Sequence, residues 1–406
     1  MSTKRTVAVL PAFRVIRLPG DRVLMQERFM SGMKPYQDNW DGDVIAIIEP
    51  APLQDLDSNV DRILAGQDRE VAIKDLGFEL HIVDYFDPRM RKLLEDVDLI
   101  LSSVSYRQNH LARIANDVGT ALIYNSEYTL KTRFQIARSE EPDFSSFVRR
   151  SAWEMNNERA VRAGIRICQG LQANGLPTYH AYKDLAPSSM YYFDGRMTQD
   201  MLIPEDKRAL RVQTMLQGGP LRLTWSGRMM KFKGADHLVE VAHHLRNLGV
   251  DFTMDLFGGG VLAEPMQARI DKLQLNDKVK LRGYVAFEKL TDENQNHFDV
   301  WVCPHPQGDP SSAYLETLGN GMPMLGYANE ALTGVLSKVN AGRTAPIGDA
   351  AGLAKLIARY DRDRQQLARW SKVGLDFARH HTFDLTFRRR AEHFAEVLAL
   401  RDASIG

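Results

Sequence analysis

The sequence has few of the features that would assign it to a special class of protein. Its 406 residues include two cysteines, Cys168 and Cys303, too far apart for a CxxC motif. A disulfide framework is therefore excluded, and a reducing cytoplasm is favoured. Lysine plus arginine and aspartate plus glutamate number 52 each, and this neutral balance excludes a general nucleic-acid binder. No apolar run approaches the roughly 18 residues that a membrane-spanning helix needs.

What the sequence does contain is ordinary for a globular protein. Hydrophobic residues make up 44% and charged residues 26%, which is enough for a sizeable core and excludes disorder as the main state. At about 150 residues per domain, the length indicates two to three domains. The first ten residues resemble a signal peptide only briefly, because Pro11 and Arg14 interrupt the apolar run, and we interpret them as a first strand.

Short apolar runs alternate with helical patterns along the chain. A helical rhythm of apolar residues between 238 and 248 ends at Gly249, a residue that terminates helices at low steric cost. This alternation predicts an α/β fold with two doubly wound, Rossmann-like sheets. The predicted strands are residues 6–10, 44–48, 80–83, 99–104 and 121–124 in the first half, and 221–225, 252–257, 279–281, 300–303 and 322–325 in the second.

Regular patterning lapses between residues 198 and 219, so we expect the domain boundary near residue 215. The predicted units are residues 1–215, residues 216–380 and a last helix at 381–406, which is free to return to the first domain. A basic cluster at residues 379–381 and 388–390 fits a solvated helix face better than a contact with anionic lipid.

The most informative segment is residues 226–234, Ser-Gly-Arg-Met-Met-Lys-Phe-Lys-Gly, which leaves a strand and enters a helix. In an open α/β sheet, ligands bind beyond the carboxyl ends of the strands, where backbone N–H groups and helix N-termini favour negative charge. Arg228 and Lys233 add formal charge at this place. The flanking pattern favours an anion site over surface cations on a plain connection.

Two further segments also follow strands. Gly258-Gly259-Gly260 is either a close backbone approach to a ligand or a plain turn. Residues 304–323 open a helix that Ser311 or Ser312 can cap. Glu316 lies about one turn inside this helix, where its carboxylate can accept two hydroxyls, as in ribose recognition, or complement the helix dipole.

Together these segments resemble the retaining glycosyltransferases of family 4, which have GT-B architecture, with two Rossmann-like domains facing each other across a cleft. The resemblance covers about residues 221–330. The matching segments are Gly227-Arg228 with Lys233-Gly234, residues 257–260, residues 282–285, and residues 315–317 with 319–323.

The resemblance implies that Arg228 and Lys233 hold the diphosphate of a nucleotide-sugar donor, that Glu316 binds ribose, and that the segment after Gly283 touches the base. It implies an acceptor-binding first domain and no cofactor, with a saccharide, a lipid-linked sugar or a small molecule as acceptor. The expected donor-binding residues are Gly227, Gly258, Gly259, Tyr284, Val285, Ser311, Ser312, Ala313 and Glu316, and the expected catalytic residues are Arg228, Lys233, Asp309 and Glu127.

The sequence departs from the family pattern in two places. The family usually has a second glutamate eight residues before the ribose glutamate, but Gly308 stands there, and we expect Asp309 or the backbone of residues 310–313 to replace it. In the first domain, residues 19–21 are the candidate for the family's glycine loop. Glu127 stands near the place of the family's histidine, where it either meets the donor sugar or acceptor or serves as a helix cap or structural hydrogen bond. Residues 172–179 read as a turn near the interdomain cleft.

Metal chemistry is not expected. Aspartates with DxD spacing occur at Asp55/Asp57, Asp96/Asp98 and Asp361/Asp363, but each pair fits a helix surface, a turn or the edge of a strand better than a metal site. By resemblance, arginine and lysine do the work that a cation does in other glycosyltransferases.

The resemblance implies a retaining glycosyltransferase of the hexosyltransferase type, moving a sugar from a nucleotide-sugar to a hydroxyl. It implies bacterial surface-polysaccharide or lipopolysaccharide synthesis in the cytoplasm, with peripheral contact at the inner membrane left open. Two alternatives stay open from the residues. One is an epimerase or phosphorolytic enzyme on the same architecture, and the other is a GT-B module that binds a donor without turnover.

Overall fold

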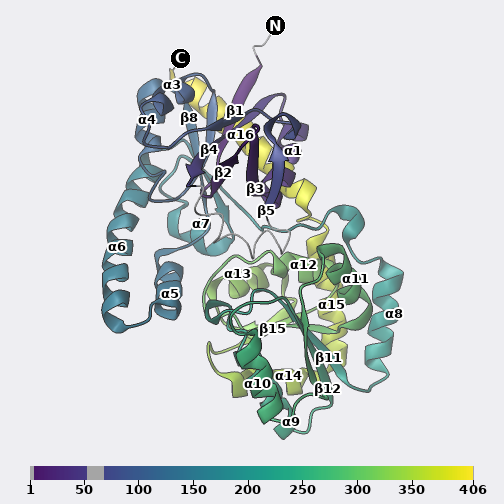
Figure 1. The fold of residues 1–406 in the computed structure, drawn as a ribbon. Coiled ribbons are helices and arrows are strands. Elements are labelled where there is room, and N and C mark those ends of the chain that lie inside the picture. The colour runs from purple at the N-terminus through teal and green to yellow at the C-terminus, as the bar shows by residue number, and fades with distance from the viewer. Residues whose placement is uncertain (1–3, 53–67, 406) are drawn as a thin grey trace.

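The structure, a computed structural model, describes residues 4–52 and 68–405. Two α/β halves lie one above the other, and the last helix runs from the second half back across the first (Figure 1). Each half is built around its own mostly parallel sheet. The predicted α/β class with two doubly wound sheets is therefore confirmed.

The sheet of the first half contains the ten strands β1 to β10 in the order β10-β9-β8-β7-β1-β4-β2-β3-β5, with β6 paired to β4. Its centre is parallel, and the apolar residues of β1 are buried because both faces of the sheet are covered. The strands are β1 (Arg5–Leu10), β2 (Arg14–Leu18), β3 (Arg22–Gln26), β4 (Gly42–Ala51), β5 (Asp68–Ala72), β6 (Leu80–Ile82), β7 (Leu99–Ser103), β8 (Ala121–Ser126), β9 (Gly170–Asn174) and β10 (Ser188–Tyr192).

Helices cover both faces of this first sheet. One buried cluster joins the sheet to α3, α4 and α6, and a second joins it to α1 and the last helix. The helices of this half are α1 (Glu27–Asn39), α3 (Arg89–Glu95), α4 (Leu111–Val118), α5 (Leu130–Glu140), α6 (Phe144–Ile167) and α7 (Leu176–Tyr182).

The second half has a six-stranded parallel sheet in the order β13-β12-β11-β14-β15-β16, around which one large apolar core forms. Its strands are β11 (Leu221–Ser226), β12 (Phe252–Phe257), β13 (Val279–Gly283), β14 (Val300–Cys303), β15 (Met324–Tyr327) and β16 (Gly342–Ala345). Its helices are α8 (Glu205–Leu216), α9 (His237–Asn247), α10 (Ala263–Lys272), α11 (Phe287–His297), α12 (Ala313–Gly319), α13 (Glu330–Val339), α14 (Ala350–Asp361) and α15 (Arg364–Ala378), with a short 3-10 turn, η4 (Lys231–Lys233), after β11.

The last helix, α16 (Phe383–Ile405), packs on the first half. The ring centroids of Phe387 and Tyr36 of α1 lie 4.6 Å apart, and Phe394 is fully buried beside them. Arg390 is buried too, over the rings of Tyr36 and Tyr192, and its Nε donates to Gln172 at 2.7 Å. The expected solvated face therefore holds for Arg388 and Arg389 but is wrong for Arg390.

The domain boundary expected near residue 215 stays a prediction, and the packing of α8 bears on where it lies. After β10 the chain leaves the first sheet, and α8 packs on α11 and α15 of the second half. We therefore propose a boundary between β10 and α8, upstream of residue 215.

The predicted strands of the first half are present, and the one expected at 322–325 is shifted to Met324–Tyr327. The glycine loop expected at residues 19–21 is wrong: these residues form the turn between the antiparallel strands β2 and β3, where Gly20 and Asp21 have positive φ. Within the described ranges, no helix is long and apolar enough to cross a bilayer.

Candidate active site

The three predicted donor segments meet at one edge of the second sheet. Because β11 lies between β12 and β14, the loops that follow these three parallel strands are neighbours. The loops are joined by backbone hydrogen bonds, from Gly227 N–H to the Phe257 carbonyl at 3.0 Å and from Met229 N–H to the Gly259 carbonyl at 2.8 Å. The loops that the sequence predicts to bind the donor therefore lie side by side at one edge of the sheet.

Two glycines make this close approach feasible. Gly258 has φ +117°, and a Cβ there would lie 2.0 Å from the Gly227 carbonyl oxygen. Gly234 has φ +64°, and a Cβ there would lie 2.2 Å from the Pro304 carbonyl oxygen. Any side chain at either position would push two loops apart, since contacts this short are sterically forbidden.

Arg228 and Lys233 lie around the same aromatic ring. The Arg228 guanidinium carbon is 5.1 Å and the Lys233 ammonium 5.5 Å from the centroid of Phe232. Arg228 is exposed and has no ion pair among the described residues, whereas Lys233 is buried and paired with Asp309. The loop therefore offers one free cation and one whose charge is already balanced.

Asp309 joins the two domains through its neighbours. Burial alone would raise the pKa of its carboxyl, but the charge and hydrogen bond of Lys233 outweigh burial and lower that pKa below its usual value. The Tyr128 hydroxyl, from the loop after β8, also donates to this carboxylate, and burial raises the pKa of Tyr128 well above its usual value, so the hydroxyl keeps its proton. Asp309 is thus ionised and held from both sides.

Position 308 carries glycine in place of the family's glutamate, and the domains lie too close together there for a larger side chain. A Cβ at position 308 would lie 2.9 Å from the Thr132 hydroxyl of α5, and the Gly308 N–H donates to the Gln135 side chain at 3.3 Å. The Lys131 ammonium also reaches Glu330 at 2.8 Å across the same interface. The place of the family's glutamate is therefore used here for contact between the domains.

Glu316 is buried in α12, one turn from its start, and the linker between the domains holds its carboxylate. Arg196 makes two hydrogen bonds to it, at 2.7 and 3.0 Å, while stacking over Phe287 at 3.9 Å. A carboxylate has about four lone-pair sites, so two remain for other donors. The expected ribose contact stays a prediction that requires sharing or displacing Arg196.

The same linker also holds the first domain. Asp194, two residues before Arg196, pairs with Arg28 at the start of α1. The charge of Asp194 is the largest influence that raises the pKa of Arg28, and Glu316 adds to it. Asp194 and Arg196 therefore connect the two halves through opposite charges.

Glu127 lies between the domains, near groups from both. The residue has an exposed surface, but the protein packed around its carboxyl group desolvates that group and raises its pKa to about 7, and the charges of Asp194 and Asp309 act in the same direction. Arg28 and Arg390 oppose this rise. The four residues expected to be catalytic thus lie in one electrostatic neighbourhood, with Glu127 across from the cationic loop.

The remaining expected donor residues surround this loop. The Tyr284 ring lies over Gly259, 2.7 Å from where a Cβ would be, and is 58% exposed, whereas Val285 packs against the core. Ser311, Ser312 and Ala313 lead into α12, but the expected cap is wrong, because the Ser312 side chain at the cap position accepts no helix N–H. Residues 172–179 form the end of β9 and the start of α7, which packs on α13 of the second half.

The aspartate pairs with metal-like spacing have other partners. The pair at residues 55 and 57 lies outside the described residues. Asp98 accepts from the Thr6 N–H at 2.8 Å, Asp361 pairs with Arg364 at 2.6 Å, and Asp363 caps α15. Among residues 4–52 and 68–405, no group of three His, Cys, Asp or Glu side chains could hold a metal ion.

Motif reasoning missed several of these residues. Arg28, Tyr128, Asp194 and Arg196 belong to no local pattern, and they meet only when the linker closes on both domains. The one available signal was the lapse of regular patterning after residue 198. It indicated roughly where the domains join, but not which charged residues connect them.

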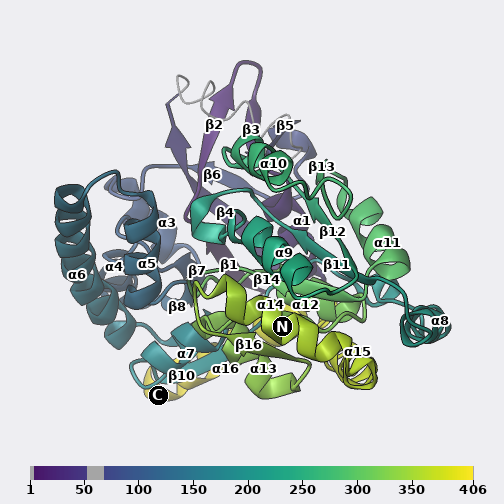
Figure 2. The same cartoon turned by 90° about the horizontal axis from the view of Figure 1, so that it is seen from below.

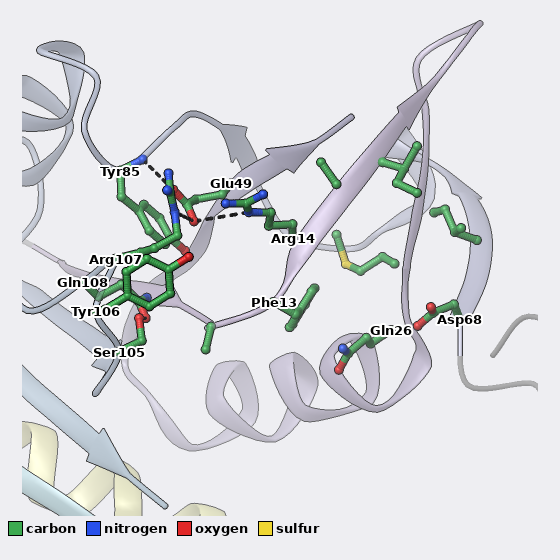
Figure 3. Close-up of a pocket in the computed structure, with 15 residues that line it drawn as sticks. Phe13, Arg14, Gln26, Glu49, Asp68, Tyr85, Ser105, Tyr106, Arg107 and Gln108 are labelled. Carbon is green, nitrogen blue, oxygen red and sulfur yellow. Dashed lines mark hydrogen bonds and ion pairs between the residues drawn. The ribbon is translucent and has the colours of Figure 1, made fainter. Parts of the chain in front are cut away.

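The first domain contains a cavity of about 420 Å³ at the carboxyl ends of β1, β4 and β7 (Figure 3). On one side Arg107 makes hydrogen bonds to the buried Glu49 at 2.5 to 2.7 Å, with Arg14 3.8 Å from the same carboxylate. Phe13 and Tyr106 supply aromatic surface. The cavity therefore combines fixed polar groups with rings, as ligand pockets do.

Comparison with known proteins agrees with this arrangement. Residues 206–376 match the family described as glycosyl transferases group 1. The chain is similar to the 2-deoxystreptamine glucosyltransferase of Streptomyces kanamyceticus, at 25% identity over 45% of this chain and 47% of that one. It is also similar to the amylovoran biosynthesis glycosyltransferase AmsK of Erwinia amylovora, at 26% identity over 47% and 48%. The matches span about half the length of these relatives.

The fold is similar to that of Anabaena HepE, solved in complex with UDP, with a TM-score of 0.66 and 14% identity over 97% of this chain and 99% of that one. The fold expected from the resemblance is therefore confirmed over nearly the whole chain. The family model covers the half that carries Arg228, Lys233 and Glu316. Over residues 206–376 the chain is therefore similar to the glycosyl transferases group 1 family, and its fold is a GT-B fold.

Proposed function

We propose that this protein is a retaining glycosyltransferase that moves a sugar from a nucleotide-sugar donor to an acceptor hydroxyl. The observation that carries the proposal is the grouping of Arg228 and Lys233 at the carboxyl edge of the second sheet, with Glu127 facing them from the first domain. When a nucleoside diphosphate leaves an anomeric carbon, negative charge grows on its phosphate. Fixed cations in a closed site stabilise that charge more than water does.

Each residue then has a distinct part. Arg228 binds the diphosphate with its free charge, and Lys233, held by Asp309, adds a second cation whose position is fixed. Ionised Glu127 stabilises the positive charge that develops at the anomeric carbon. The bond from that carbon to the diphosphate breaks while a bond to the acceptor oxygen forms on the same face, and the acceptor proton leaves with the diphosphate.

The cavity of the first domain supports an acceptor site. It opens at the strand ends that face the second domain, and Gln26 at its edge lies two residues before Arg28, which contacts the linker. Its carboxylate and guanidinium groups suit hydroxyls, and its rings suit the apolar face of a sugar. We therefore propose a saccharide acceptor, free or lipid-linked.

Similarity to other proteins supports the donor and the setting. HepE has been solved with UDP and with UDP-glucose, and AmsK is named for amylovoran biosynthesis. We propose a UDP-sugar donor and a role in bacterial surface-polysaccharide or lipopolysaccharide assembly, at the cytoplasmic face of the inner membrane.

Product analysis tests the proposed reaction. Incubation with UDP-glucose and a panel of saccharide acceptors should give UDP and a glycosylated product whose anomeric proton has the coupling of an α-glucoside. Nuclear magnetic resonance reads both products in one sample. Free or isomerised sugar in place of a glycoside would contradict the transfer and support an epimerase or phosphorolytic reaction, and binding without turnover would support a donor-binding module.

The pH dependence of turnover tests the role of Glu127. Because its pKa is raised to about 7, the ionised form is the minority below that pH and the majority above it. We expect kcat to rise with pH through this range, since catalysis needs the carboxylate, and Glu127→Gln should lower kcat and remove the titration. A wild-type profile that the glutamine variant reproduces would assign Glu127 no catalytic part.

The raised pKa of Glu127 also affects stability. Stability should fall with rising pH over the range in which kcat rises. The native state holds the Glu127 proton more tightly than the unfolded chain does. Its contribution to stability is therefore complete below the unfolded pKa and is lost as pH rises through about 7. Thermal melts of the wild type and of Glu127→Gln across this range separate that effect from the effect on kcat.

A further inference from the structure

The outer face of α6 exposes an unusual amount of apolar surface. Phe144 is 70% exposed, Met155 51% and Trp153 43%, and Val148 and Ile167 are exposed too. Several large apolar side chains left open to water on one helix are a common feature of interaction surfaces. In both views α6 lies at the outer edge of the first half, with no other element over this face (Figures 1 and 2).

The charges on the same helix are of one sign. Arg149, Arg159 and Arg166 are exposed and form no ion pair within the described part of the chain. The two acidic residues of α6, Glu154 and Glu158, are buried on the inner face and paired with arginines. The outer face of α6, which we call the α6 surface, is thus cationic and apolar with no exposed carboxylate from its own helix.

The α6 surface is continuous with the cavity of the first domain. The Trp153 ring meets the Tyr106 ring edge to face, with centroids 5.5 Å apart, and Tyr106 lines the cavity. Tyr106 itself is 57% exposed. A partner bound along α6 would therefore lie beside the mouth of the proposed acceptor site.

We propose that the α6 surface docks on an anionic lipid bilayer, with the aromatic side chains at the headgroup boundary and the arginines on lipid phosphates. Exposed aromatic side chains beside unpaired arginines suit such an interface, because the rings sit at the headgroup level and the arginines bind anionic lipid. The proposal deepens the proposed function, because it rests on the acceptor cavity and implies an acceptor presented from the membrane surface.

A second copy of this chain is a poorer occupant. Two α6 surfaces facing each other would bring unpaired arginines together without carboxylates to balance them, and like charges in contact oppose association. A bilayer containing anionic lipid supplies the missing negative charge. Charge complementarity therefore favours the membrane.

Cosedimentation with vesicles tests the proposal directly. The full-length protein should bind vesicles of phosphatidylcholine mixed with phosphatidylglycerol much more than vesicles of phosphatidylcholine alone, and added salt should weaken the binding. In the variant Arg149→Gln/Arg159→Gln/Arg166→Gln, affinity should fall on the order of a hundredfold, since each basic residue near such a surface contributes about a fivefold factor. Glutamine keeps the helix, because its helix propensity is close to that of arginine.

The matched control removes the same charge elsewhere. Lys272, Lys280 and Lys355 are exposed on the second half and form no ion pair among the described residues. Their replacement by glutamine should leave vesicle binding unchanged. Equal losses in the two triple variants would mean that net charge alone drives binding, which would overturn the proposal.

The remaining outcomes are equally decisive. Absence of binding to anionic vesicles, or binding that the α6 variant retains, would overturn the proposal. So would a concentration-dependent dimer in analytical ultracentrifugation that the α6 substitutions dissolve, because the surface would then belong to a second copy. Donor binding by the α6 variant, measured by calorimetry, should match the wild type, so that failure at the membrane is distinguished from failure of the proposed function.

Discussion

Replacement of Arg228 by alanine should lower kcat by about a hundredfold to a thousandfold, the range seen when one fixed group that stabilises transition-state charge is removed. Arg228 is exposed and has no ion pair among the described residues, so its loss leaves no buried charge without a partner. The melting temperature should therefore stay within experimental error of the wild type. A steady-state assay with UDP-glucose and a thermal melt measure the two quantities.

The control for this variant separates charge at the site from charge in general. Arg228→Lys keeps the cation but loses the fork of donors that matches a diphosphate, so it should recover only part of the activity. Lys280→Ala removes an exposed charge from β13 and should leave kcat unchanged. Full activity in Arg228→Ala would contradict the assignment of the diphosphate site to the loop that carries Arg228.

Replacement of Lys233 by alanine should lower both turnover and stability, because Lys233 belongs to the diphosphate site and to a buried ion pair. Lys233 and Asp309 form a buried pair, with 11% and 13% of their side chains exposed. Loss of one partner leaves the other charge buried without compensation, at a cost of about 3 kcal/mol in the free energy of unfolding. Denaturant unfolding and the transfer assay measure the two losses.

The double variant Lys233→Ala/Asp309→Asn separates the two effects. Neutral asparagine no longer needs a cation, so most of the lost stability should return. Activity should not return, because the second cation is still missing from the diphosphate site. Recovery of turnover together with stability would mean that Lys233 serves the fold alone.

Local motifs were readable from the sequence because each is contiguous. The stretch from Gly227 to Gly234 carries its own turn, charges and helix entry, and the structure builds that loop as expected. The helix ending at Gly249 was also predictable, since its apolar spacing and its positive-φ terminator lie within one segment. Most strands are predicted for the same reason, because their burial on both faces leaves an apolar run.

Contacts between distant segments were not readable. The pairing of Arg196 with Glu316 and of Asp194 with Arg28 depends on the path of the linker, which no periodicity encodes. The packing of α16 on α1 likewise needs the three-dimensional arrangement, although the apolar residues of that helix were evident. The turn at residues 19–21 was misread because Pro-Gly-Asp suits a hairpin as well as a ligand loop.

Calorimetric titration of the wild type with UDP, GDP and ADP, with Arg228→Ala as the reference, tests the central claim most directly. We predict saturable binding of UDP, weaker heats with the other two nucleotides, and at least a tenfold loss of UDP affinity in the variant, or about 1.4 kcal/mol. No binding of any nucleotide, or equal affinity in the variant, would contradict the assignment of Arg228 and its loop as a donor site.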